Sequence, residues 1–540
     1  MATPEDFDRL TDRRDRVRER LPGSLGLIAG ILALFLLSPI IWVLLRAVAV
    51  NPARAFSLLT DPDTVGIVVN SLVMTAVVTA ASIVLGVPLA LLTAQTNLPF
   101  RRVWTVVVAL PLVIPSYVGA FAFVSAFGPR GVLQGLLAPL GVEQLPAVYG
   151  LGGTVVVLTV FSYPYVYLTT RASLLSVDRS VLEAARTLNH DRISALRRVV
   201  LPQIKPGVAA GALLVALYTL SDFGTPAIMH YDVFTRMIYV EYINQNRGFA
   251  ALLSLVLLGL TVIILAWESR INASREGAHV SGGGERPARV ALGRWRWPSM
   301  LLPISVAVIG LVVPLAILGM WLVRPAAAYG GGLGFQLSYA WNSVAVAGAA
   351  AVASVCVGLP IAYVAARSES PLAKLPERAS YIGYAVPGVV LGLALVFLGL
   401  SYVPALYGTV AILVFAYVVR FVPQAVGILE SSILQVDPEH AEAARSMGES
   451  PLSAFRHVTL PQILPGVAAG AALVFLTTMK ELPATLMLRP LGFETFVTYI
   501  WQVQEGGYYG QAAIPALVLV AVSALSMLVI LGRERYHGTE

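Results

Sequence analysis

Long apolar stretches alternate with short polar ones along the whole chain. Windows of about 20 apolar residues, the length at which a helix crosses a bilayer, predict twelve spans. The first six are expected at about 24–46, 66–92, 103–127, 147–170, 206–229 and 248–267, and the other six at about 300–323, 342–366, 377–399, 404–424, 465–488 and 511–532. The pattern therefore predicts an all-α polytopic membrane protein with about 12 transmembrane helices.

Polar segments divide the chain into two units. The spans are preceded by a charged N-terminal segment and followed by a short tail, and the segment between the units contains SGGGERPAR, which is typical of a flexible linker. The first apolar run is longer than a signal-peptide core and has no convincing cleavage site, so we expect a retained helix. The predicted parts are 1–23, the first unit 24–267, the linker 268–298, the second unit 299–532 and the tail 533–540.

Basic residues are distributed unequally across the predicted spans. With the N-terminus inside, 29 of the 37 Lys and Arg residues fall on the inner side, and the other eight lie outside or within the membrane. Loops rich in Lys and Arg stay in the cytoplasm. We therefore predict that both termini, the linker and the polar loops at 171–205 and 425–464 are cytoplasmic.

These two loops are copies of one another. Residues 183–211 read EAARTLNHDRISALRRVVLPQIKPGVAAG and residues 442–470 read EAARSMGESPLSAFRHVTLPQILPGVAAG, so 18 of 29 positions match at an offset of 259. Matches also occur at an offset of 272, where the dipeptide Asn-Ser at 70 and a proline at 115 recur at 342 and 387. Because each unit holds an even number of spans, we expect two parallel six-helix repeats.

Each repeated loop is predicted to form a helix-turn-helix elbow at the inner membrane face. The first helix is expected to end at Asn189 in one copy and at Gly448 in the other, because both residue types tolerate the left-handed backbone of a turn. A second short helix, capped by Ser450 in the second copy, is expected to end at Pro202 and Pro461. The membrane helix would then begin.

A small-residue surface marks the elbows as candidate docking sites. The Ala pairs are expected to lie on a face smooth enough to enter a groove on another protein. The candidate residues are Glu183, Ala184, Ala185 and Arg186 in the first copy, and Glu442, Ala443, Ala444 and Arg445 in the second. An elbow could also serve only to link spans, but two copies this similar between diverged spans favour docking.

Ionisable residues also occur inside the predicted spans. At the offset of 259, Asp222 aligns with Glu481, and Lys480 precedes the latter. Charged groups at this depth are costly in lipid and usually line a cavity or pair with one another. Two interpretations stay open. The two carboxylates present an oxygen-rich surface to a hard cation on a translocation path, or Lys480 neutralises one of them as a tie between helices.

Composition excludes several classes of function. The mean hydropathy of +0.77 and the charged fraction of 12% exclude a soluble globular protein. The net charge of +7 is spread over residues that flank spans, which argues against a nucleic-acid partner. One cysteine, six histidines without ligand spacing and no phosphate-loop motif predict no metal site, no catalytic cluster and no ATP hydrolysis by that route.

The elbow motif resembles a known signature. EAA, three residues, Gly and then a spacer ending in Leu-Pro is similar to the signature of permease subunits of binding-protein-dependent ABC importers; Gly448 fits it and Asn189 departs from it. Members of that family also occur as two six-span permeases fused in tandem, so the resemblance covers nearly the whole chain. It implies a type I importer permease in a bacterial inner membrane.

The same resemblance implies partners rather than chemistry in this chain. Two copies of a cytoplasmic ABC ATPase would hold ATP and Mg and receive the elbows, and a periplasmic binding protein would deliver the substrate. The permease itself would hold no cofactor and would not be an enzyme.

Two further segments narrow the resemblance. LSDFGTPAIMHYDVFTRMIYVEY and MKELPATLMLRPLGFETFVTYIW resemble the ferric-iron branch of the fused permeases, which implies ferric iron as the substrate. Importers of the same class for thiamine, polyamines or phosphonates stay open as alternatives. An ion-coupled secondary transporter that uses Asp222 and Glu481 is a further alternative, although such a transporter has no use for the elbows.

Overall fold

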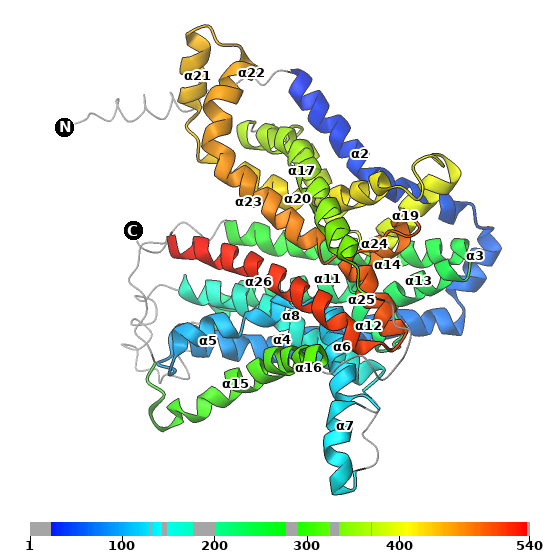
Figure 1. Ribbon diagram of the computed structural model, residues 1–540. Helices are drawn as coiled ribbons and strands as arrows, with labels where there is room; N and C mark the ends of the chain where they lie inside the picture. The colour runs from blue at the N-terminus through cyan, green and yellow to red at the C-terminus, as the bar shows by residue number, and fades with distance from the viewer. Residues whose placement is uncertain are drawn as a thin grey trace.

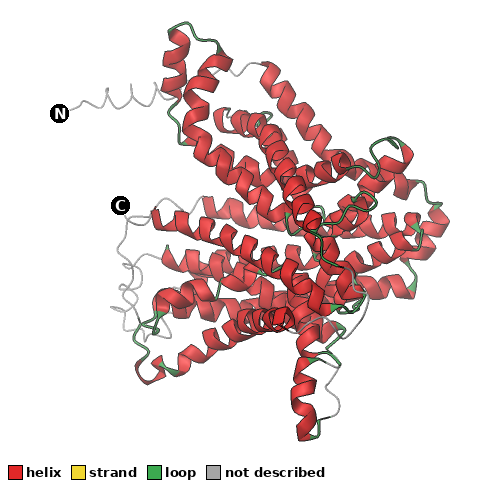
Figure 2. Ribbon diagram, in the orientation of Figure 1, coloured by secondary structure: helices red, strands yellow, loops and turns green. Residues whose placement is uncertain are grey.

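A computed structural model describes residues 23–129, 131–142, 148–176, 201–276, 290–323, 334–368 and 370–536. These residues form helices and loops, without a strand among them (Figures 1 and 2). Nine of the described helices are long and apolar enough to cross a membrane, or up to eleven if each of two bent pairs counts as one span. The prediction of an all-α polytopic protein is confirmed.

The helices of the first repeat follow one another in a fixed order. They are α2 (Gly23–Val48), α3 (Pro52–Leu59), α4 (Pro62–Gln95), α5 (Arg101–Val107), α6 (Ser116–Phe127), α7 (Val132–Leu137), α8 (Leu151–Leu175), α11 (Leu201–Ser221), α12 (Gly224–Ile228), α13 (Phe234–Ile243) and α14 (Arg247–Glu276).

The second repeat has the same order, with an elbow described in addition. Its helices are α15 (Leu301–Ala307), α16 (Val313–Val323), α17 (Leu337–Arg367), α18 (Leu375–Ala385), α19 (Gly388–Ser401), α20 (Val410–Leu434), α21 (Pro438–Ser446), α22 (Pro451–Ala454), α23 (Leu460–Thr478), α24 (Pro483–Leu488), α25 (Phe496–Glu505) and α26 (Ala513–Tyr536).

The opening helix of each repeat packs on the other repeat. α2, from the first repeat, contacts α17, α18 and α19 of the second repeat, and α16, from the second repeat, contacts α6 of the first. Figure 1 shows the blue α2 running beside α17 and α19. One apolar core accordingly contains Leu36 of α2 together with Val389 of α19 and Val422 of α20. The two repeats are therefore interlocked, and their shared core holds the interface together.

Each of the predicted spans 103–127 and 377–399 is a bent pair of helices rather than one straight helix. The bend is 92° between α5 and α6 and 102° between α18 and α19. Pro115 and Pro387 stand at the bends with extended backbone, at ψ 136° and ψ 142°. Proline has no N–H for the helix ladder and disfavours helical backbone in the residue before it, so the prolines repeated at the offset of 272 mark these bends.

The predicted spans 206–229 and 465–488 are also interrupted. α11 ends at Ser221 and α23 ends at Thr478, and the short helices α12 and α24 follow each break. Most of α24 is buried, and it packs on α19. The breaks therefore lie inside the protein, and they carry Asp222 and Glu481.

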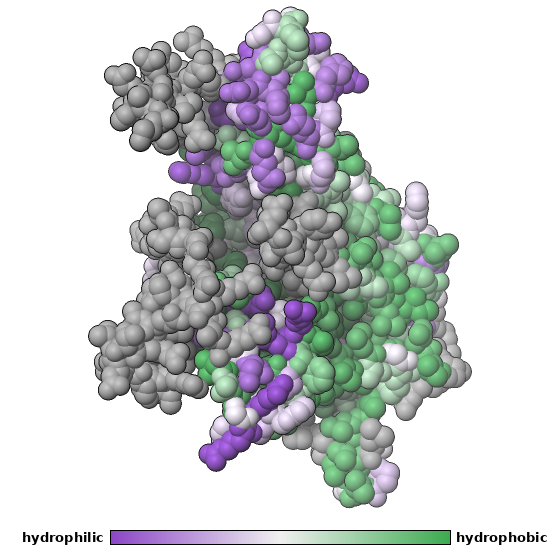
Figure 3. All heavy atoms as spheres, turned by 90° about the vertical axis from the view of Figure 1, so that its left-hand side faces the viewer, coloured by the Kyte–Doolittle hydropathy of each residue, from purple (hydrophilic) through white to green (hydrophobic). Residues whose placement is uncertain are grey.

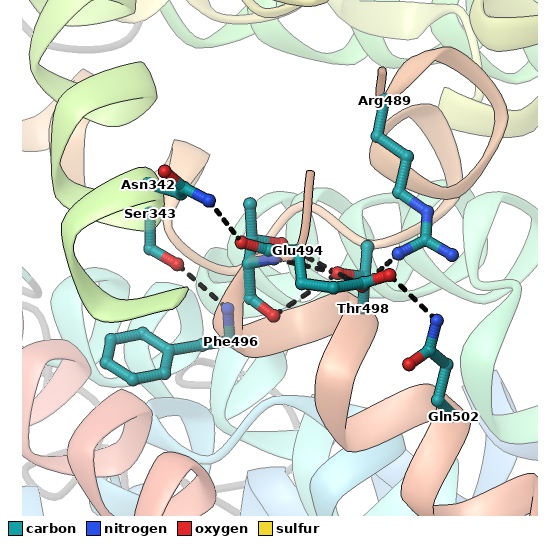
Figure 4. Close-up of polar contacts among 8 residues, drawn as sticks. Asn342, Ser343, Arg489, Glu494, Phe496, Thr498 and Gln502 are labelled. Atoms are coloured by element: carbon teal, nitrogen blue, oxygen red, sulfur yellow. Dashed lines mark hydrogen bonds and ion pairs between the residues drawn. The ribbon is translucent and has the colours of Figure 1, made fainter. Parts of the chain in front are cut away.

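The repeated Asn-Ser dipeptide fixes the helix that follows each break. In the second repeat Asn342 Nδ2 donates to the carbonyl oxygen of Glu494 at 2.9 Å, and the backbone N–H of Phe496 donates to Ser343 Oγ at 2.8 Å (Figure 4). These bonds join α17 to the start of α25. The Glu494 carboxylate is held as well, by an ion pair and two side-chain donors from Arg489, Thr498 and Gln502.

The first repeat reproduces this arrangement. Asn70 Nδ2 donates to the carbonyl oxygen of Asp232 at 3.0 Å, and the N–H of Phe234 donates to Ser71 Oγ at 3.1 Å. The Asp232 carboxylate pairs with Arg236. The Asn-Ser match in the sequence therefore has a structural cause, because it positions α13 and α25 after the breaks.

We expect Ser343→Ala to destabilise the chain by about 1–3 kcal/mol, because the buried N–H of Phe496 would lose its acceptor. The thermal unfolding midpoint of the purified chain in detergent measures this loss. Ser71→Ala should cause a similar decrease, whereas Ser338→Ala, at an exposed position of the same helix as Ser343, should cause none. Equal midpoints for the 343 and 338 variants would contradict the assignment.

Candidate functional site

The second elbow has the predicted turn and caps. α21 and α22 lie at one extremity of the molecule, at the top of Figure 1. Gly448 has φ +96°, so the left-handed turn is confirmed. Ser450 Oγ accepts from the N–H of Ser453 at 3.2 Å, with Pro451 in the first turn. Asp437 caps α21 in the same way, since its carboxylate accepts from the N–H of Glu439 at 3.0 Å.

The expected helix end at Pro461 is wrong. A π-helical turn, Phe455–Thr459, joins α22 to α23, and Pro461 stands in the first turn of α23. Pro451–Thr478 is therefore one helical segment of 28 residues, about 42 Å long at 1.5 Å per residue. One stiff element thus connects the elbow with the break that carries Glu481.

The surface of the elbow differs from the prediction. Ala444 is only 5% exposed, because α21 packs against α22 and the π-helical turn, whereas Ala443 is exposed. The large apolar side chains on the elbow surface are Met447 at 81% and Leu452 at 76% exposure. Figure 3 shows hydrophobic groups at the tip of this otherwise hydrophilic region. The signal for them in the sequence was one large apolar residue on each side of Gly448, within an otherwise polar loop.

Other elbow residues are placed as follows. Glu442 is partly buried, and Arg445 is exposed. In the first copy Pro202 is the second residue of α11. The remaining predicted residues, Glu183, Ala184, Ala185, Arg186 and Asn189, lie outside the described residues.

The break after α23 holds a buried ion pair. Arg420 Nε lies 3.3 Å from Glu481 Oε2, and the two side chains are 17% and 7% exposed. The N–H of Ala484 donates to Glu481 Oε1 at 3.4 Å. Arg420 comes ten residues after the start of α20, about 15 Å along a helix. It therefore lies within the span, at a position that would be costly without its acidic partner.

The 29 basic residues counted on the inner side include Arg420, and its position within α20 shows that this part of the count is wrong. Moving it changes the basic count from 29 and eight to 28 and nine, which leaves the orientation argument intact. The expected tie through Lys480 is replaced as well, because the base that pairs with Glu481 is Arg420. None of the ion pairs between described residues involves Lys480.

At the break after α11, the carboxylate of Asp222 is hydrogen-bonded by neutral groups. Ser116 Oγ donates to Asp222 Oδ1, and the N–H of Thr225 donates to Oδ2 at 3.0 Å. The carbonyl oxygen of Asp222 accepts from Thr235 Oγ1 at 2.7 Å. Within the described part of the chain the Asp222 carboxylate has hydroxyl and amide donors and no basic partner.

The repeats differ at two matched positions around these carboxylates. Gly388 follows the bend of the second repeat as Ser116 follows that of the first, and Arg420 aligns with Phe161 at the offset of 259. A Cβ at Gly388 would overlap Arg420 Nη1 and Glu481 Oε1. The missing side chain therefore leaves the space that the ion pair occupies.

Both breaks lie at the interface between the repeats. Phe223 and Leu482, which directly follow Asp222 and Glu481, belong to one apolar core cluster, and the ring centroids of Phe223 and Trp501, one from each repeat, are 5.2 Å apart. Tyr117 of the first repeat belongs to the same cluster as Leu482. The structure thus places Asp222 and Glu481, 259 residues apart in the sequence, beside the same apolar cluster at the interface between the repeats.

These groups form an oxygen-rich surface rather than a closed metal site. The described residues contain no group of three or more His, Cys, Asp or Glu side chains that could hold an ion. Hard cations prefer six or more oxygen ligands when they are held tightly. Asp222 and Glu481 with their neighbouring hydroxyls offer fewer oxygen ligands than such a site uses.

Comparison with known proteins gives one family and several relatives. The model described as binding-protein-dependent transport system inner membrane component matches residues 82–324 and 358–533. A Fe(3+)-transport system permease protein of Haemophilus influenzae is 31% identical over 515 residues, which cover 95% of this chain and 98% of the relative. A ferric transport system permease protein of Actinobacillus pleuropneumoniae is 24% identical over 87% of this chain and 71% of its own length.

A relative of half the length supports the duplication. A probable molybdenum ABC transporter permease protein of Haloferax volcanii is 31% identical over 261 residues, which cover 93% of that protein but 47% of this chain. Each of the two stretches matched by the family model contains one elbow sequence and one of the two carboxylates.

Proposed function

The chain belongs to the family of binding-protein-dependent transport system inner membrane components, and from this premise we propose that it carries ferric iron into the cytoplasm. It is a multi-pass permease subunit of an ABC importer with two copies of the family domain. As a permease it is not an enzyme, and ATP is hydrolysed by a separate subunit. Ferric iron is supported by the relative that matches 95% of the chain.

We propose that two copies of a cytoplasmic ATPase, which hold ATP and Mg, dock on the two elbows. The exposed Met447 and Leu452 support this proposal, because large apolar side chains on a polar loop indicate a contact surface. Both termini and the linker would lie on the same side of the membrane. A periplasmic binding protein would deliver the cargo to the opposite face.

The proposed path runs between the repeats, past Asp222 and Glu481. Interrupted membrane helices commonly form transport sites, and carboxylate oxygens suit a hard cation such as ferric iron. Closure of the ATPase dimer would displace the elbow, and the helical segment Pro451–Thr478 would carry that displacement to the break. The permease lowers no chemical barrier, because it couples ATP hydrolysis to a conformational change.

Uptake of radiolabelled ferric iron by cells that lack the chain, with and without the chain restored from a plasmid, tests this function. We expect uptake only with the chain, and its loss when ATP is depleted. Uptake that is indifferent to the chain would contradict iron as the cargo, and thiamine, polyamines and phosphonates would then be tested. Uptake that survives ATP depletion but stops with an ionophore would indicate a secondary transporter.

Gly448→Asn should retain most transport, whereas Gly448→Val should reduce it about tenfold, because a β-branched residue at positive φ costs about 1–2 kcal/mol or more. Ferric-iron uptake measures the effect, with membrane levels of the chain compared by immunoblot. The matched pair in the first elbow is Asn189→Gly and Asn189→Val, for which we expect the same order. Equal uptake by the two Gly448 variants would show that the turn is not needed for coupling.

A further inference from the structure

The ion pair between Arg420 and Glu481 has no obvious structural purpose. A buried ion pair contributes little net stability, because both charges lose their hydration, and well-packed apolar residues often do as well or better. The first repeat illustrates this, since Phe161 fills the position that aligns with Arg420 and is 2% exposed. The second repeat nevertheless retains a guanidinium there, and Gly388 leaves room for it.

Only some of the hydrogen-bond donors of the Arg420 guanidinium have an acceptor. Its Nε lies 3.3 Å from Glu481 Oε2, whereas Nη1 is buried and has no hydrogen-bond partner among the residues that the structure describes. A buried donor without an acceptor destabilises the arrangement that contains it. A modest displacement of either side chain can therefore replace the closed ion pair by an arrangement in which Arg420 and Glu481 are apart.

The pair also joins the two elements whose relative movement matters most. Arg420 belongs to α20, and Glu481 lies three residues after the last residue of α23. The far end of the segment that contains α23 is the elbow. If the segment Pro451–Thr478 slides along its axis or rotates about it, Glu481 moves relative to Arg420.

We propose that Arg420 is a tethered counter-cation. It neutralises the Glu481 carboxylate while the translocation path holds no cargo, and it separates from Glu481 when closure of the ATPase dimer displaces the elbow. This inference rests on the proposed function of the chain as an ATP-driven importer. With the pair closed, Glu481 is neutralised, whereas the Asp222 carboxylate has no basic partner among the described residues. With the pair open, Glu481 and Asp222 together face the cargo, so the site for a cation is assembled only in the driven state.

ATP hydrolysis by the complete complex of the chain and its ATPase, reconstituted in nanodiscs, tests this proposal. It is measured first without and then with the iron-loaded binding protein. Arg420→Gln should raise the hydrolysis that occurs without cargo about five- to tenfold, the range of a typical coupling energy, and should reduce its stimulation by cargo. The charge exchange Arg420→Glu with Glu481→Arg should restore a low rate without cargo, because the pair is reformed.

Arg236→Gln is the matched control, because it removes a basic residue from an ion pair of the first repeat that does not join α20 to α23. It should leave the rate without cargo unchanged. An unchanged rate in an assembled Arg420→Gln complex would overturn the proposal, and so would a charge exchange that stays uncoupled although it assembles. Absence of cargo-stimulated hydrolysis in the unmodified complex would instead overturn the proposed importer function.

Discussion

Replacement of Met447 and Leu452 by Glu should release the ATPase from the chain. Both side chains are more than three-quarters exposed on an elbow whose other surface is mainly polar. Burial of two such side chains in a groove would contribute about 3–6 kcal/mol, which corresponds to a change in affinity of about 10²–10⁴-fold. Co-purification of the ATPase with an affinity-tagged chain measures the loss.

Leu491→Glu is the control for this experiment. Leu491 is fully exposed at the turn between α24 and α25, far from the elbow along the chain, so the ATPase should co-purify as with the unmodified chain. Ala444→Arg would be a poor test, because Ala444 is buried within the elbow and a long charged side chain there would disrupt its fold. Retention of the ATPase by the double Glu variant would exclude these two residues from the contact.

Local rules were sufficient to predict the elbow from the sequence. A turn that needs positive φ selects Gly or Asn, and Ser followed by Pro begins a helix through its own side chain and backbone. Gly448 and Ser450 therefore have the predicted geometry. The burial of Ala444 could not be predicted in the same way, because it depends on how α21 packs against α22.

The spans illustrate a different limit. Hydropathy measures how apolar a stretch is and contains no information about the direction of its backbone, so the bends and breaks were read as continuous helices. The prolines at 115 and 387 did carry the signal, since proline cannot continue the ladder. Their recurrence in both repeats indicates a shared feature, but only the structure shows that this feature is a bend.

Arg420 was missed because its role depends on a contact across the fold. Its partner, Glu481, is 61 residues further along the chain, and the adjacent Lys480 was the nearest base that a sequence argument could offer. Only the packing of α20 against the end of α23 shows which base neutralises the carboxylate. Gly388 matches Ser116 at the offset of 272, but a glycine in a sequence does not show which side chain fills the space beside it.

Gly388→Val should abolish ferric-iron uptake, because its Cβ would occupy the space of the Arg420 guanidinium and the Glu481 carboxylate. The backbone has little room to retreat, since Pro387 fixes the bend and the first ten residues of α19 are buried. Separation of a buried ion pair leaves uncompensated charges and costs about 3–5 kcal/mol. We therefore expect a lower unfolding midpoint together with uptake below about a tenth of normal.

Gly348→Val provides the matched control for this substitution, because it places the same side chain on a membrane helix where a Cβ meets no atom within 4 Å. Its uptake and unfolding midpoint should equal those of the unmodified chain. Gly388→Val combined with Arg420→Ala and Glu481→Ala should recover much of the lost midpoint, but not normal coupling, because both side chains that the new Cβ would meet are shortened and no buried charge is left unpaired. Normal uptake by Gly388→Val alone would show that transport does not depend on a closed Arg420–Glu481 pair at this break.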